Sequence, residues 1–339
     1  MRGTVLVARQ DNLGDVLLAG PAVRAVAAAA DETVLLAGPR GRAAADLLPG
    51  VDRVLTWCAP WIDPDPPEVR DAGVERFVEQ VRALGVSEAV LLTSFHQSAL
   101  PLALLLRMAG VRRIGAISED YPGSLLDVRH RITGDPPEPE RALSVARACG
   151  FELPAGDAGR LAVRRPLPDV RHLVGRPGYV VLHPAASVPA REWPVQRCRQ
   201  AVRALADRGH RVVVTGAPGD EELTAEVSGS RALDLGGRTS LHELAAVLDG
   251  ADVVIAPNTG PAHLAAAVGT PVVSLFAPVV RAERWAPYGV PAVVLGDQEA
   301  PCKDSRARTC PIPGHPCLSD VDASAVVAAV ESMLREVAA

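Results

Sequence analysis

Short apolar runs alternate with longer amphipathic segments along almost the whole chain. Each run is bounded by turn residues, which is typical of strands buried on both faces of a parallel sheet. The longer segments between the runs have helical spacing, so the alternation predicts doubly wound α/β architecture. In the first half, the predicted strands are residues 4–8, 33–37, 51–55, 88–92 and 113–116, and the predicted helices are residues 16–30, 43–48, 73–84, 98–109 and 140–149. Residues 57–70 and 121–131 are predicted to be irregular, and Pro21 is expected to bend or restart the first helix.

The same alternation restarts at Tyr179. Its clearest stretch is residues 253–278, a strand, a turn, a small apolar helix and another strand. The predicted strands of this half are residues 179–183, 211–215, 232–234, 253–256, 272–276 and 290–295, and the predicted helices are residues 194–209, 221–228, 241–248, 262–268 and 321–338.

The restart divides the chain into two domains of ordinary size. We predict a first domain over residues 1–155, a linker rich in proline and glycine over residues 156–178, and a second domain over residues 179–320. The last segment, residues 321–339, is expected to be a helix that can pack back on the first domain. Two such halves offer a cleft at the carboxyl ends of their strands, where ligands of α/β proteins bind.

Composition narrows the class of protein. The 35 basic and 40 acidic residues give a net charge of −5, which argues against a nucleic-acid partner. No secretory signal or long apolar span is evident, so we expect a cytoplasmic chain. Cys302, Cys310, His315 and Cys317 are residue types that bind zinc, but their spacing does not match a paired zinc finger. We favour a loop of reduced thiols and expect no metal site.

Candidate catalytic chemistry lies in the turns that follow the predicted strands. Asp15 follows the first strand, where a carboxylate can act as a general base or can simply cap the next helix. His96 and Gln97 follow the strand at residues 88–92, where their side chains can face the cleft, although a structural histidine is an equal alternative. The glycine spacing around Gly14 lacks the G-x-G-x-x-G pattern, which weakens a dehydrogenase interpretation.

The second half carries small and polar residues in several such turns, a combination that suits a nucleotide diphosphate. The turn at residues 257–261 opens a helix whose free amides favour an anion, and an arginine fork pairs well with phosphate oxygens. Each of these residues also has an ordinary structural explanation, such as capping a helix or lying on the surface. The candidates are Ser187, Arg191, Thr215, Gly216, Glu221, Glu222, Thr259, Gly260 and His263.

Three ordered motifs resemble glycosyltransferase family 9, the ADP-heptose:lipopolysaccharide heptosyltransferases. They are Leu13-Gly14-Asp15-Val16 with Pro21-Ala22-Val23-Arg24, then His183-Pro184 leading to Arg191-Glu192-Trp193-Pro194, then Thr259-Gly260-Pro261-Ala262-His263-Leu264.

The resemblance implies a GT-B fold, with two Rossmann-like domains facing a cleft, an acceptor-binding first domain and a donor-binding second domain. His96 and Gln97 of the first domain are then candidate acceptor contacts. It implies an inverting transfer from an ADP-sugar to a glycan or glycolipid hydroxyl, without metal or cofactor. We expect a monomer whose membrane contact, if any, is peripheral.

The resemblance also assigns roles. Asp15 matches the catalytic base, and Arg191 matches a position, usually lysine, that contacts the donor diphosphate. Thr239, with Ser240 beside it, matches the segment lying against the base, although this turn can instead only cap the following helix. Asn258 stands where heptosyltransferases usually carry aspartate, which leaves the sugar open. Two alternatives remain: a nucleotide-sugar 2-epimerase or hydrolase of the same fold, and a nucleotide-sugar binding protein without catalysis.

Overall fold

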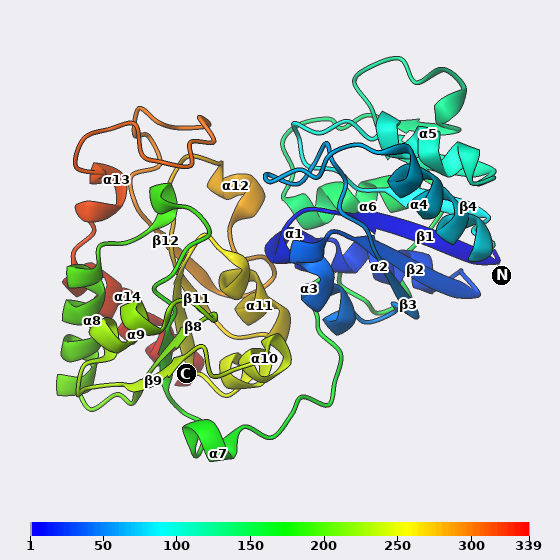
Figure 1. Cartoon of the computed structure of the whole chain (residues 1–339). Helices are drawn as coiled ribbons and strands as arrows, with labels where there is room; N and C mark the ends of the chain where they lie inside the picture. The colour runs from blue at the N-terminus through cyan, green and yellow to red at the C-terminus, as the bar shows by residue number, and fades with distance from the viewer. Residues whose placement is uncertain (1, 339) are drawn as a thin grey trace. The chain divides into compact units, whose positions relative to one another are not determined.

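The computed structural model describes residues 2–338, which form two compact units that meet in the sequence at Arg164 and Arg165. This boundary lies inside the segment predicted as a linker, residues 156–178. Each unit contains a six-stranded parallel sheet with helices on both faces (Figure 1). The strand order is β3-β2-β1-β4-β5-β6 in unit 1 and β12-β11-β10-β7-β8-β9 in unit 2. These are the same doubly wound order, so each sheet has a switch point beside its first strand.

Unit 1 closely follows the predicted alternation. Its helix α1 begins at Leu13 rather than at residue 16, and α2 restarts at Gly20 with Pro21 in its first turn. Its elements are β1 (Thr4–Arg9), α1 (Leu13–Leu18), α2 (Gly20–Ala27), β2 (Glu32–Ala37), η1 (Pro39–Gly41), α3 (Arg42–Leu47), β3 (Arg53–Thr56), α4 (Asp71–Ala83), β4 (Glu88–Leu91), α5 (Leu100–Met108), β5 (Arg113–Ile117), η2 (Gly123–Leu125), β6 (Val128–His130) and α6 (Glu138–Ala148).

One prediction for unit 1 is wrong. Residues 121–131 are not wholly irregular, because β6 (Val128–His130) pairs in parallel with β5 at the edge of the sheet. The strand has three residues, all half-buried, and its sequence ends in Arg129 and His130. An edge strand this short and polar has no apolar run that would mark it in the sequence.

Unit 2 repeats the architecture of unit 1. The terminal helix α14 packs on α8 and against β10 and β11 of its own unit (Figure 1). Its elements are α7 (Arg171–Val174), β7 (Val180–Leu182), η3 (Pro189–Arg191), α8 (Val195–Asp207), β8 (Val212–Gly216), α9 (Glu221–Ser228), β9 (Leu233–Gly236), α10 (Leu241–Asp249), β10 (Val253–Pro257), α11 (Gly260–Val268), β11 (Val272–Leu275), α12 (Ala282–Trp285), β12 (Ala292–Leu295), α13 (Pro316–Ser319) and α14 (Ala323–Ala338).

Both cores lie between the sheet and its helices. In unit 1, Leu6 on β1 belongs to the cluster that includes Phe77 of α4 and Leu102 of α5. In unit 2, Val180 and Leu182 of β7 belong to a cluster with residues of α8 and α14. The central strands are apolar along their length because helices cover both faces. Within residues 2–338, no helix combines the length and apolarity needed to cross a bilayer.

Candidate active site

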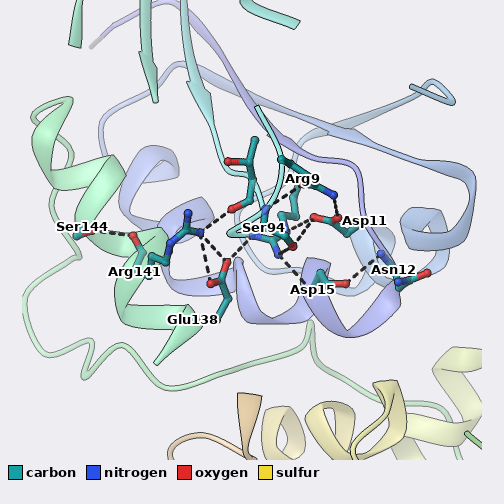
Figure 2. Close-up of polar contacts among 10 residues, drawn as sticks. Arg9, Asp11, Asn12, Asp15, Ser94, Glu138, Arg141 and Ser144 are labelled. Carbon is teal, nitrogen blue, oxygen red and sulfur yellow. Dashed lines mark hydrogen bonds and ion pairs between the residues drawn. The ribbon is translucent and has the colours of Figure 1, made fainter. Parts of the chain in front are cut away.

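Arg9, the last residue of β1, is the centre of a charged cluster at the switch point of unit 1 (Figure 2). Its side chain is 1% exposed, and three carboxylates surround its guanidinium. Nη1 donates to Glu138 Oε1 at 2.5 Å, Nη2 lies 3.2 Å from Asp15 Oδ1, and Nε lies 2.8 Å from Asp11 Oδ2. Burial alone would lower the pKa of Arg9, but the three carboxylates outweigh it and raise the pKa, so the guanidinium stays charged.

Asp15 lies in the first turn of α1, where its carboxylate Oδ2 accepts a hydrogen bond from the Asn12 backbone N–H at 3.2 Å (Figure 2). Since α1 begins at Leu13, Asp15 does not precede the helix, but this contact caps it from the third helical position, so the capping alternative holds in that form. A helix start favours a nearby negative charge. Burial first, and then the neighbouring Asp11 carboxylate, raise the pKa of Asp15 to about 6, and Arg9 opposes the rise. A carboxylate with this pKa is ionised at neutral pH and is a stronger base than an ordinary aspartate.

Asp11 is fixed from the opposite side of the cluster by the turn that follows β4. Gln97 Nε2 donates a short hydrogen bond to Asp11 Oδ1, and Gln97 Oε1 accepts from the Ser94 backbone N–H at 2.9 Å. Ser94 Oγ accepts from Arg9 Nη2 at 3.0 Å. The side chain of Gln97, predicted as an acceptor contact, is therefore engaged within unit 1, whereas His96 lies exposed in the same turn.

Glu138 reaches the cluster from the start of α6, far along the chain from β1. Its side chain is 1% exposed and also pairs with Arg141 at 3.3 Å. Arg141 in turn donates to the Thr93 carbonyl at 2.6 Å and stacks over the Phe95 ring at 4.2 Å. The site residues predicted from the sequence do not include Arg9, Asp11, Glu138, Arg141 or Ser94. A charged Arg9 at the end of an apolar strand was a usable signal, whereas Glu138 has no local signal.

In unit 2 the predicted donor residues lie at the carboxyl ends of β7, β8, β9 and β10, in the turns that follow them or at the starts of the next helices. These strands are neighbours in the sheet, in the order β10-β7-β8-β9. Since all four are parallel, their carboxyl ends share one edge. The topology therefore assembles turns that are up to about eighty residues apart in the sequence.

The turn after β10 lies at the switch point of unit 2 and leads into α11. Asn258 is 4% exposed, and neither of its amide atoms has a hydrogen-bond partner among residues 2–338. Arg191 Nη1 donates to the Asn258 carbonyl at 3.4 Å. His263 is 6% exposed, and its Nδ1 has no hydrogen-bond partner within the described part of the chain. Buried polar groups of this kind are normally satisfied by some partner, so a ligand is a natural candidate.

His263 is neutral at physiological pH. Burial, and then the positive charge of Arg191, lower its pKa to about 4. Its ring lies in the first turn of α11, which begins at Gly260 with Thr259 preceding it and Pro261 in the first turn. The first backbone N–H groups of a helix lack partners within the helix, so they can bind an anion.

Three of the other predicted donor residues, Thr215, Ser240 and Glu221, form hydrogen bonds within unit 2. Thr215 is fully buried and its Oγ1 lies 3.0 Å from His183 Nδ1, so it joins β8 to the end of β7. Ser240 caps α10 by accepting from the Glu243 N–H at 3.2 Å, as the capping alternative requires. Glu221 accepts from the Gly219 N–H at 2.8 Å. Ser187 and Glu222 are exposed, Thr239 is half-buried and Gly216 ends β8.

The cysteine-rich loop has free thiols. Cys302 and Cys317 are buried and Cys310 is half-buried, none of them in a disulfide. Within residues 2–338, no three histidine, cysteine or acidic side chains form a group that could hold a metal ion.

Comparison with known proteins gives a consistent result. The chain is 32% identical over 165 residues to the lipopolysaccharide heptosyltransferase 3 of Escherichia coli, a match that covers 46% of this chain and 47% of that protein. The chain thus spans about half the length of the curated relatives it matches.

Solved structures match over the full length. The E. coli ADP-heptose lipopolysaccharide heptosyltransferase II aligns with a TM-score of 0.76 and 18% identity, covering 99% of this chain and 100% of that one. The E. coli heptosyltransferase WaaC aligns with a TM-score of 0.69 and 20% identity, covering 98% of each chain. At identities this low, the structural alignments establish a shared fold and nothing more. That fold is GT-B, which consists of two Rossmann-like units.

The family profile extends across both units. The profile described as glycosyltransferase family 9 (heptosyltransferase) matches residues 82–315, from the end of α4 in unit 1 to the loop before α13 in unit 2. This match covers more than half of the chain and shows that the chain belongs to glycosyltransferase family 9.

Proposed function

We propose that the chain is an inverting glycosyltransferase that moves heptose from ADP-heptose to a hydroxyl group of a glycan or glycolipid. The observation that carries the proposal is Asp15, a carboxylate at the switch point of unit 1 whose pKa is raised to about 6. Family membership and the relatives named as lipopolysaccharide heptosyltransferases support the reaction class and a lipopolysaccharide-type acceptor.

In the proposed reaction, Asp15 removes the proton from the acceptor hydroxyl as its oxygen attacks the anomeric carbon of the donor. The new bond joins the acceptor oxygen to that carbon. The bond from the carbon to the diphosphate oxygen breaks with its electron pair, and ADP leaves. Attack from the face opposite the leaving group inverts the anomeric centre. A general base whose pKa lies near the working pH is largely ionised and still binds a proton strongly.

Unit 2 is proposed to bind the donor. Arg191, the N–H groups at the start of α11, and neutral His263 offer positive charge and hydrogen-bond donors for a diphosphate. Asn258, Thr259 and Gly260 lie in the same turn, and Asn258 offers the sugar an unpartnered amide. Ser187, Thr215 and Gly216, with Glu221, Glu222, Thr239 and Ser240, are proposed to border the nucleoside. WaaC, which shares the fold, has been solved with ADP.

We further propose that turnover needs no divalent cation. Arg191 and the start of α11 can stabilise the charge of the departing diphosphate directly. Asp63 and Asp65, the acidic pair spaced like a metal-binding D-x-D, both lie beside Arg40, at 3.5 and 2.6 Å. Turnover should be unchanged in EDTA, and its loss with recovery on adding Mg²⁺ or Mn²⁺ would contradict this proposal.

The test of function is a transfer assay with purified protein, ADP-heptose and lipopolysaccharide from a strain that lacks the heptose region. We expect ADP release that depends on acceptor and a product heavier by one heptose. ADP release at full rate without any acceptor would instead indicate a hydrolase or epimerase. Tight ADP-heptose binding without turnover across a broad acceptor panel would indicate a binding protein.

A further inference from the structure

Three carboxylates share two arginines at the switch point of unit 1, and this imbalance has a consequence for the base. Asp11, Asp15 and Glu138 carry three negative charges, while Arg9 and Arg141 carry two positive ones. One carboxylate is therefore in excess. In a site shielded from water, a like charge nearby favours protonation of the carboxylate that is held least firmly.

The geometry identifies Asp15 as that carboxylate. Glu138 is 1% exposed and lies 2.5 Å from Arg9. Asp11 is 8% exposed, lies 2.8 Å from Arg9 and also accepts from Gln97. Asp15 has the longest contact with Arg9, 3.2 Å, and the greatest exposure of the three, 18%. Asp15 is therefore the most accessible of the three carboxylates, whereas Asp11 and Glu138 are held by more and shorter contacts (Figure 2).

We propose that Asp11 is a positioning residue for transfer: held by Arg9 and Gln97, its fixed negative charge makes Asp15 a stronger base. Glu138, which pairs with Arg9 through Nη1, adds a smaller effect of the same sign. This inference rests on the proposed role of Asp15 as the base. It assigns a task to Gln97 other than acceptor binding, namely holding the Asp11 carboxylate in place.

Other charged groups near α1 are already paired with partners of their own. The elements packed against α1 are α2, α3, α6 and η1. Only α6 contributes charges to the cluster, through Glu138 and Arg141. The remaining charged side chains of the other three elements pair elsewhere: Arg24 with Asp157, Arg40 with Asp63 and Asp65, and Arg42 with Asp46.

The decisive variant is Asp11→Asn, which removes the charge and keeps the shape. The proton affinity of Asp15 is read directly by carbon-13 NMR of aspartate-labelled protein, in which the Asp15 carboxyl signal is the one missing from Asp15→Asn. We expect the Asp15 titration to move to lower pH by about one unit or more in Asp11→Asn, as for loss of a like charge at close range. Glu138→Gln should move it less in the same direction. The matched control is Asp46→Asn, an exposed carboxylate of the same unit, which should leave the titration unchanged.

The same variants are then compared in the pH profile of kcat/KM. The acidic limb should follow the NMR titration in Asp11→Asn, with a lower plateau because the base is weaker. If the role of Asp11 were purely structural, Asp11→Asn would reduce activity equally at every pH. The Asp15 NMR titration and the acidic limb of the kcat/KM profile would then stay in place, which would overturn the inference. The NMR result stands whether or not Asp15 is the base. If Asp15→Asn retains turnover while the NMR shift occurs, the proposed function fails and the electrostatic coupling does not.

Discussion

The two sheets have the same strand order, yet their switch points are built in opposite ways. In unit 1 the carboxyl ends of β1 and β4 meet a cluster in which charged side chains are bonded to one another. In unit 2 the turn after β10 leaves the amide of Asn258 and Nδ1 of His263 without hydrogen-bond partners among the described residues. The buried charges of the first site are paired with one another, whereas the second site presents buried neutral polar groups that a ligand can satisfy.

This difference has a physical meaning. A general base must keep one position and one proton affinity before substrate arrives, and a rigid buried network provides both. A donor site must exchange its own partners for those of the ligand, so strong internal bonds there would compete with binding. We infer that one sheet of the duplicated architecture organises the catalytic base and the other organises the donor.

The strongest test of this comparison is Asp15→Asn. Turnover should fall about 100-fold or more because a neutral amide cannot accept the proton, while ADP binding should be nearly unchanged. Steady-state transfer and isothermal titration with ADP measure the two effects separately. Turnover close to that of the wild-type protein would remove Asp15 from catalysis.

The same substitution should stabilise the fold. The pKa of Asp15 in the folded chain, about 6, lies above the ordinary value of 3.8, so folding disfavours the ionised form. The free energy of unfolding therefore falls as the pH rises between these two values. Above pH 6 the full cost of burying the ionised Asp15 is present. Asp15→Asn should raise the free energy of unfolding by roughly 2 kcal/mol at pH 8 and by much less near pH 4. Urea unfolding at both pH values, with Asp46→Asn as control, measures the gain. An equal gain at both would refute the link to ionisation.

In unit 2, Arg191→Ala should weaken ADP binding by about 10-fold or more, equivalent to about 1.4 kcal/mol, and should slow transfer as well. One guanidinium would hold the diphosphate in both the ground and transition states. The matched control is Arg199→Ala, an exposed arginine of α8 that lies 3.5 Å from Glu226. Titration with ADP compares the variants, and an unchanged dissociation constant would exclude Arg191 from the site.

The mildest effect concerns the base of the nucleotide. We expect ADP to bind at least about 10-fold more tightly than GDP or UDP. The turn from Gly237 to Ser240 is the proposed reader, because glycine lets the backbone approach a ring closely. Gly237 has a φ of 65°, and a side chain at this position would collide with Glu221, so the turn lies beside the start of α9. Competition binding decides the matter, and equal affinities would discard base reading by this turn.

The sequence by itself determined the position and type of the longer helices and strands. Apolar runs such as Val253–Pro257 form strands that are buried on both faces. Such a run is a local property of the chain and can be recognised from the sequence. It also identified the turns that carry Asp15, Arg191 and Asn258, since turns after parallel strands face one edge. The short edge strand β6 was missed because its three half-buried residues do not form an apolar run.

Only the tertiary structure decided which side chains meet. Glu138 contacts Arg9 across 129 positions of sequence, and Gln97 contacts Asp11 across 86. Neither contact follows from spacing, because sheet order and the packing of α6 bring these residues together. The same is true of the rise in the pKa of Asp15 above the ordinary aspartate value, which depends on burial and on the Asp11 charge. Local pattern specifies elements, whereas the electrostatics of a buried site depend on the whole fold.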